Sequence, residues 1–153
     1  MRRWSMAVVS RDLPCPPEDV LRVLADGWSY ATWVVGTSRI RGVDAGWPAP
    51  GARIAHSAGL WPLVLQDVST SKRWDPDHGI ELEARGSFVG DAVVAISVAP
   101  TAGGCRVRIA EDAVRGPATL LPRPLRAALL SFRNRETLYR LGALSCRPAT
   151  SAA

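Results

Sequence analysis

Apolar and polar residues alternate along much of the middle of this chain, a pattern typical of β-strands with one buried face. In residues 80–85, for example, every second side chain is apolar and those between are charged. Such segments recur at hairpin spacing with turn residues between them, which favours one antiparallel sheet with one covered face. The predicted strands are residues 4–13, 37–43, 52–60, 63–72, 80–85, 91–99 and 105–112.

Helical signals flank this run of strands. A short helix is predicted to open at Pro17, because proline and the two acidic residues after it favour a first turn, and to end at Gly27. Residues 28–35 form a second short helix or a turn. The longest helix is predicted from Leu125 to Ser145, with Pro124 at its entry. A sheet of about seven strands must curl around this last helix to cover its own apolar face, which gives an α+β fold.

The long helix is apolar on two opposite sides, so either side could face the sheet. One side carries Leu125, Leu129, Phe132, Tyr139 and Ala143 together with Glu136; the other carries Leu130, Leu138 and Leu141 with Ala127 and Asn134. A helix of this kind is expected to be buried on both sides, between the sheet and a lid, loop or partner chain. Glu136 is expected to pair with Arg140 or Arg133. Asn134 either bonds a nearby backbone group or faces a ligand.

The size and charge of the chain limit its class. At 153 residues it is most simply one domain, which we place at residues 1–146, followed by a flexible tail at 147–153. The net charge is +5, and the residues after Asp112 include seven arginines but a single acidic residue, Glu136. A transient contact with an anionic membrane surface would suit this basic end. No nucleic-acid motif is present, so no specific nucleic-acid partner is expected. Monomer and homodimer both stay open.

The three cysteines, Cys15, Cys105 and Cys146, are far apart and have no CxxC spacing. Their odd number and wide spacing fit small buried thiols in a reducing compartment. No apolar run is long enough for a membrane span, and the run at residues 6–9 is too short for a signal peptide. We therefore expect a soluble, cytoplasmic protein.

Two titratable residues are candidates for chemistry. His56 is in phase with Ile54, so it is predicted to face the sheet interior, where a neutral imidazole could act as a base or bind a carbonyl. The alternative is a buried histidine satisfied by a neighbour. Glu111 shares a face with Ile109 and could exchange a proton in a dry cavity. Its alternative is a pair with Arg115 or another arginine at the sheet rim, which we favour.

Chemical signatures are otherwise absent from the sequence. Two histidines are too few to predict a metal site. There is no phosphate-binding glycine loop, nucleophile elbow or dinucleotide fingerprint, so no cofactor is expected.

The order of elements resembles the START-like, helix-grip superfamily, which includes polyketide cyclases and aromatases, lipid-transfer domains and the Bet v 1 type. The residues that carry the resemblance are VVSRDLPCPPEDVLRVLADGWSYATWVVG (8–36), VDAGWPAPGARIAHSAGLWPLVLQD (43–67), IAEDAVRGP (109–117) and RNRETLYRLGAL (133–144). They are similar above all to actinobacterial SRPBCC proteins. The resemblance implies a curved antiparallel sheet around a long C-terminal helix, with two short helices after the first strand and a deep cavity for an apolar ligand.

Pocket residues follow from this fold and from the strand phases. We expect them to be Trp28, Tyr30, Trp33, Ile54, His56, Trp61, Leu82, Ile96, Val107, Ile109, Asn134 and Leu138. The favoured function is binding, and also transfer, of a small hydrophobic molecule such as a lipid, isoprenoid or polyketide. One alternative is a polyketide aromatase/cyclase that moves protons with His56 or Glu111. The other is an interaction module that uses the basic C-terminal helix. Binding is favoured over catalysis because no chemical signature is present.

Overall fold

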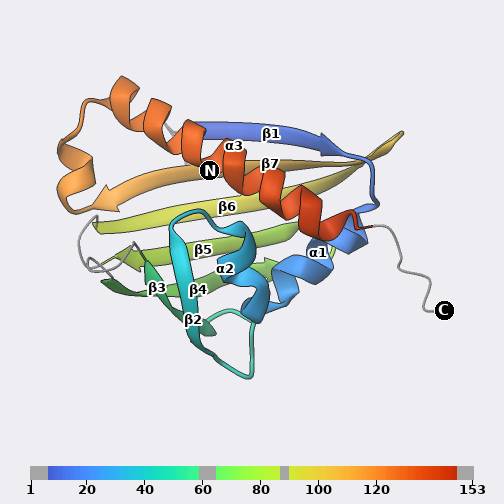
Figure 1. Cartoon of the computed structure of the whole chain (residues 1–153), viewed down its shortest axis with the longest axis horizontal. Coiled ribbons are helices and arrows are strands. Elements are labelled where there is room, and N and C mark those ends of the chain that lie inside the picture. The colour runs from blue at the N-terminus through green and yellow to red at the C-terminus, as the bar shows by residue number, and fades with distance from the viewer. Residues whose placement is uncertain (1–6, 59–64, 87–89, 148–153) are drawn as a thin grey trace.

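Seven strands form one antiparallel sheet in the computed structural model, which describes residues 7–58, 65–86 and 90–147. Each strand pairs with the next along the chain, except that β1 lies beside β7 at the far edge (Figure 1). The strands are β1 (Ala7–Leu13), β2 (Thr37–Val43), β3 (Arg53–Ala58), β4 (Leu65–Asp75), β5 (Gly79–Gly86), β6 (Gly90–Thr101) and β7 (Gly104–Arg115).

The predicted strands agree with this sheet, and the main differences are the ends of β4 and β7, which each lie three residues beyond the predicted end. The strand β4 continues to Asp75 because Trp74 pairs with Ile80 and Asp75 with Gly79 to close the hairpin onto β5. The strand β7 continues to Arg115, which pairs with Asp91 of β6. The register also sets Ile96 of β6 opposite Ile80 of β5, so apolar residues meet on the same face. Trp61 and the turn predicted around it lie outside the described residues.

Helical elements fill the two long connections and the end of the chain. They are α1 (Pro17–Ala25), the 3₁₀ turn η1 (Gly27–Ser29), α2 (Tyr30–Trp33), the 3₁₀ turn η2 (Pro117–Leu120) and α3 (Arg123–Ser145). The helix α3 lies across one face of the sheet and packs mainly against β1, with α1 and α2 next to it (Figure 1). The predicted α+β architecture is therefore confirmed. Among the described residues, no helix is both long and apolar enough to cross a membrane.

The core lies between the sheet, α1 and the C-terminal half of α3. Val20 of α1, Val107 of β7 and Leu141 of α3 are completely buried there. Gly142 lets α3 approach β1, because a Cβ at this position would lie 2.6 Å from the side chain of Leu13. Side chains fill the core at this end of the molecule. The earlier part of α3 borders a cavity instead.

One of the two apolar sides of α3 faces inward, and the other is exposed. Asn134, Leu138 and Leu141 are buried, whereas Leu129 and Phe132 on the opposite side are exposed. Among the described residues, no lid or loop of the chain covers this second side, so that part of the expectation is wrong, and cover by a partner chain stays a prediction. The inward side was hard to choose from sequence because each side carries one polar residue, Glu136 or Asn134.

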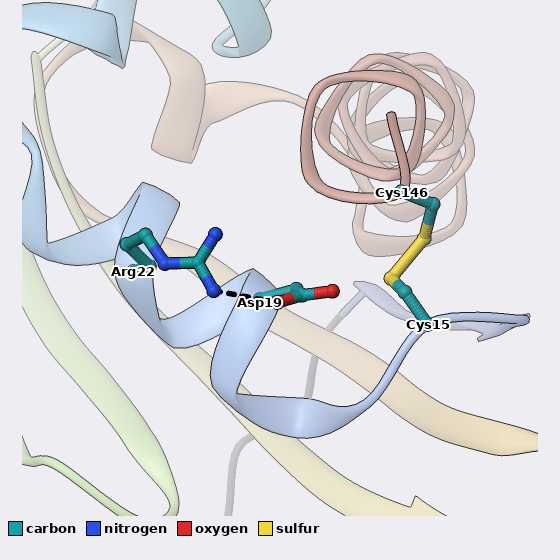
Figure 2. The surroundings of a disulfide bond; sticks show 4 residues. All are labelled: Cys15, Asp19, Arg22 and Cys146. Atoms are coloured by element: carbon teal, nitrogen blue, oxygen red, sulfur yellow. Dashed lines mark hydrogen bonds and ion pairs between the residues drawn. A yellow bond between two sulfur atoms is a disulfide. The ribbon is translucent and has the colours of Figure 1, made fainter. Parts of the chain in front are cut away.

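A disulfide joins Cys15, just after β1, to Cys146 at the end of α3, across a sequence separation of 131 residues (Figure 2). The prediction of three free thiols is therefore wrong for this pair, and Cys105 alone is free and buried. The reason lies in the topology. Because α3 packs along β1, its last turn reaches the loop that leaves β1, and the two Cα atoms come within 5.3 Å.

Candidate functional site

A cavity of about 380 Å³ lies between the sheet, the segment from α2 to β2, and the N-terminal half of α3. Its walls are mostly apolar. Val34 comes from the segment between α2 and β2, Leu82 and Ile96 come from the middle of the sheet, and Leu130 comes from α3. This volume falls within the usual range of small-molecule sites, about 300–1,000 Å³. A hydrogen bond of 3.3 Å from the Val35 amide to Thr137 Oγ1 ties the crossover to α3 beside the cavity.

The short helix α2 delivers two aromatic side chains to the cavity. Asp26 caps the preceding turn by accepting a hydrogen bond from the Trp28 amide, so the chain enters α2 in a fixed direction. Tyr30 and Trp33 are three residues apart, so they lie on one helix face, and both are buried. Their rings meet edge to face, with centroids 5.3 Å apart.

Tyr30 takes part in the first of two polar groups at the cavity, which we call the tyrosine group: Tyr30, Ser69 and His56. The Ser69 hydroxyl of β4 lies 2.8 Å from the Tyr30 hydroxyl and 3.0 Å from His56 Nε2 of β3. All three side chains are buried. They therefore form a hydrogen-bonded chain that runs from α2 across two strands. Which atom donates in each hydrogen bond depends on the histidine tautomer.

Burial controls the protonation of this group. It lowers the pKa of His56 below its usual 6.5; the nearby Asp67 carboxylate opposes this shift and Arg41 adds to it. Burial also raises the pKa of the Tyr30 phenol, against its hydrogen bond with Ser69. Near neutral pH the group therefore holds an uncharged imidazole and an uncharged phenol.

The second polar group, the glutamate group, consists of Glu111, Arg133 and Asn134. Glu111 lies near the end of β7, and its side chain is 3% exposed. Arg133 donates to one carboxylate oxygen, and Asn134 Nδ2 donates to the other at 2.7 Å. Both carboxylate oxygens therefore have a donor, as buried polar groups require, and the contacts link β7 to α3 beside the cavity.

The glutamate group also affects Tyr30. Burial is the main cause of the raised pKa of the phenol, while the charge of Arg133 lowers this pKa and that of Glu111 raises it. Tyr30, Arg133 and Glu111 all line the cavity. The cavity wall is therefore mostly apolar, with these two polar groups and further polar side chains at Asp67, Arg85 and Asp91. No group of three or more histidine, cysteine, aspartate or glutamate side chains that could hold a metal ion occurs among the described residues.

A family model described as "Polyketide cyclase / dehydrase and lipid transport" matches residues 6–144. The chain belongs to this family. No match is found among curated proteins.

Several proteins of known structure share its fold across nearly the whole chain. Protein CV1439 from Chromobacterium violaceum has a TM-score of 0.70 at 20% identity, over 92% of this chain and 97% of its own. Ara h 8.0201 has a TM-score of 0.68 at 13% identity, over the same shares, 92% and 97%. SA2116 from Staphylococcus aureus, described as of unknown function, has a TM-score of 0.71 at 9% identity, over 90% and 91%. These similarities confirm the helix-grip fold, and the family match confirms the superfamily inferred from the sequence and supports a ligand-binding role in general.

The structure brings together seven of the twelve residues that the sequence placed in the pocket of this family member. Those that line the cavity are Tyr30, Trp33, His56, Leu82, Ile96, Ile109 and Asn134. Three others, Ile54, Val107 and Leu138, are buried in the core and do not line it. Trp28 lies outside as well, with 63% of its surface exposed, since the cap at Asp26 turns it away from Tyr30. Trp61 lies outside the described residues.

Sequence reasoning missed the partners of the candidate residues. Glu111 pairs with an arginine, as favoured, but the arginine is Arg133 of α3, and Arg115 is not the partner. Asn134 donates a hydrogen bond to the side chain of Glu111 on β7, whereas the sequence analysis expected a backbone group or a ligand as its partner. Ser69 carries no signal of its own in the sequence. Its phase in β4 opposite the buried Ile54 is the one clue that it faces inward.

Proposed function

We propose that the protein binds a small, mainly apolar molecule with one or more polar atoms, held in the cavity between the sheet and α3. The observation that carries this is the composition of the cavity wall, which is mostly apolar and includes polar side chains of the tyrosine group and the glutamate group, with further polar side chains such as Asp67, Arg85 and Asp91. An apolar pocket with a few convergent polar groups is the usual form of a small-molecule site. The polar groups would orient the ligand and the apolar walls would supply most of the affinity.

The ligand class we infer is a lipid, isoprenoid or polyketide. A volume of about 380 Å³ suits a ring system or a short chain. The family description, which includes lipid transport, supports the same class. Transfer of the ligand between donor and acceptor is part of the proposal.

Filling the cavity should abolish binding. Ala92 of β6 lines the cavity, whereas Ala95, three residues on, is as exposed and does not line it. Ala92→Phe should weaken binding of the fluorescent probe 8-anilinonaphthalene-1-sulfonate by about tenfold or more, since a phenyl ring removes apolar space. Ala95→Phe is the matched control and should bind like the wild type. Titration of the probe fluorescence measures both.

Native mass spectrometry of the gently purified protein is the complementary measurement. A co-purified mass in the lipid range that disappears in Ala92→Phe would support the proposal. Equal probe binding by both variants, together with a bare protein mass, would reject the cavity as the site.

A second candidate, an aromatase/cyclase acting on a poly-β-ketone, is favoured by the tyrosine group. Ring closure needs a base to take a proton from a methylene between two carbonyls and an acid to protonate the new oxygen. His56 is held uncharged by burial and sits 3.0 Å from Ser69, which in turn contacts Tyr30. Such a chain could relay one proton.

This candidate has a direct test. A linear poly-β-ketone thioester should aromatise faster with the protein, as followed by absorbance, and His56→Ala should reduce the rate by about 10²-fold or more. Glu111→Gln should reduce it only if the glutamate group also moves protons. No acceleration by the wild type would exclude the candidate and leave ligand binding standing.

A further inference from the structure

Large apolar side chains are exposed on one side of α3 and on the segment before it, and the acidic residue Glu136 lies on the same side of the helix. We call this set the α3 stripe: Leu120, Leu121, Leu125, Leu129, Phe132 and Tyr139. Leu120 is 86% exposed and Phe132 is 79% exposed. Single exposed apolar residues are common on soluble proteins, but several of them together on one side of a helix mark a binding surface.

Arginines border the α3 stripe on both sides. At 100° per residue, Arg126, Arg133 and Arg140 fall along one flank and Arg135 along the other. The guanidinium of Arg11 on β1 adds a cation, 5.3 Å from the ring centroid of Tyr139. The helix has one acid, Glu136, and Arg140 already pairs with it at 3.1 Å.

Two arginines of α3 have no acidic partner within the described part of the chain. Arg126 pairs with Asp112 and Arg133 with Glu111. Arg123 and Arg135 are exposed and form no ion pair there. They are therefore available to an anionic partner, at the start and in the middle of α3.

The combination of charge and shape selects the partner. A second copy of the chain would press two arginine-bordered stripes against each other, with one glutamate in each that is already paired. An anionic lipid surface instead accepts apolar side chains among its acyl chains and offers phosphates to the flanking arginines. Tyrosine beside the stripe suits the headgroup layer. We propose that the α3 stripe docks the protein on an anionic membrane surface with α3 lying in the interface.

The position of the stripe connects it to the cavity. Leu130, Arg133 and Asn134 line the cavity from the same helix, so α3 separates the cavity from the docking surface. A docked protein would hold its cavity one helix away from the lipid. The proposal goes beyond ligand binding and does not depend on it, since docking needs no occupant in the cavity.

Co-sedimentation with sucrose-loaded vesicles tests the docking. The wild-type protein should bind vesicles of phosphatidylcholine with 30% phosphatidylglycerol at 50 mM NaCl, bind at least about tenfold more weakly at 500 mM NaCl, and bind pure phosphatidylcholine weakly. Leu129→Ser/Phe132→Ser removes the most exposed apolar part of α3, and Arg123→Gln/Arg135→Gln removes the two unpaired cations. Each double variant should bind the anionic vesicles at least about tenfold more weakly than the wild-type protein does.

The matched control is Arg39→Gln/Arg108→Gln. It makes the same change of charge at two exposed arginines on β2 and β7 that also form no ion pair among the described residues. This variant should bind like the wild type. Thermal unfolding of all variants should occur near the wild-type temperature, because every altered side chain is exposed.

Three results would overturn the proposal. The first is absence of binding to anionic vesicles at low salt. The second is equal loss in the control variant, which would mean that net charge alone matters. The third is a wild-type dimer in light scattering that becomes a monomer in Leu129→Ser/Phe132→Ser, which would assign the stripe to a second copy. Probe binding in the cavity is measured separately, so failure here leaves the proposed function untouched.

Discussion

His56 shows how burial sets the chemistry of a single residue. Its imidazole is enclosed between strands β3 and β4 and meets Ser69 through Nε2, while Nδ1 is buried without a protein partner. Its ring also lies near that of Tyr30, with centroids 5.2 Å apart. The phase of His56 with Ile54 was readable from the sequence. Its neighbours were not, since they come from segments 13 and 26 residues away.

The lowered pKa of His56 predicts how stability depends on pH. The unfolded chain binds a proton at this residue below about pH 6.5, whereas the folded protein does so only at lower pH. Between these values the unfolded state holds more protons, so the free energy of unfolding falls as the pH falls, by at most about 1.4 kcal/mol per pH unit.

Urea denaturation at pH 5.5 and pH 7.0 measures this effect. His56→Gln should reduce the difference between the two pH values, whatever its effect on absolute stability. His78→Gln, at the exposed turn before β5, is the control and should keep the wild-type difference. If His56→Gln retains the full difference, His56 is not its source.

At the scale of elements, α3 organises the molecule through two contrasting halves. Its C-terminal half packs on β1 through Gly142 and ends at the disulfide, whereas its N-terminal half borders the cavity. The sequence predicted the helix within two residues at its start, because its proline entry and helix formers are local signals. It could not predict the disulfide, because Cys15 and Cys146 meet only after the whole sheet has been assembled.

The disulfide should contribute strongly to stability. Closing a loop of 131 residues restricts the unfolded chain, so Cys15→Ser/Cys146→Ser should lower the free energy of unfolding by about 2–4 kcal/mol. Thiol titration in denaturant gives the independent check, with one reactive thiol in the oxidised protein and three after reduction. Three thiols without reductant would show that the bond does not form.

At the scale of the whole molecule, the fold was predictable and the site only in part. Alternation along the strands, turn residues between them and one long final helix determine a sheet wrapped on a helix. The cavity wall depends instead on where each strand passes beneath α3. Val107 and Ile109 show the limit: both point inward from β7, but only Ile109 reaches the cavity, because the core closes around Val107.

The pairing of β1 with β7 has a consequence for synthesis of the protein. The residues facing each other in this ladder, such as Val9 and Ile109, are 100 residues apart in a chain of 153. The ribosome therefore releases β1 long before β7 is synthesised. Until then, β1 has no neighbouring strand to pair with and its apolar side stays uncovered. We expect the emerging chain to need shielding by a chaperone until its last hairpin is complete.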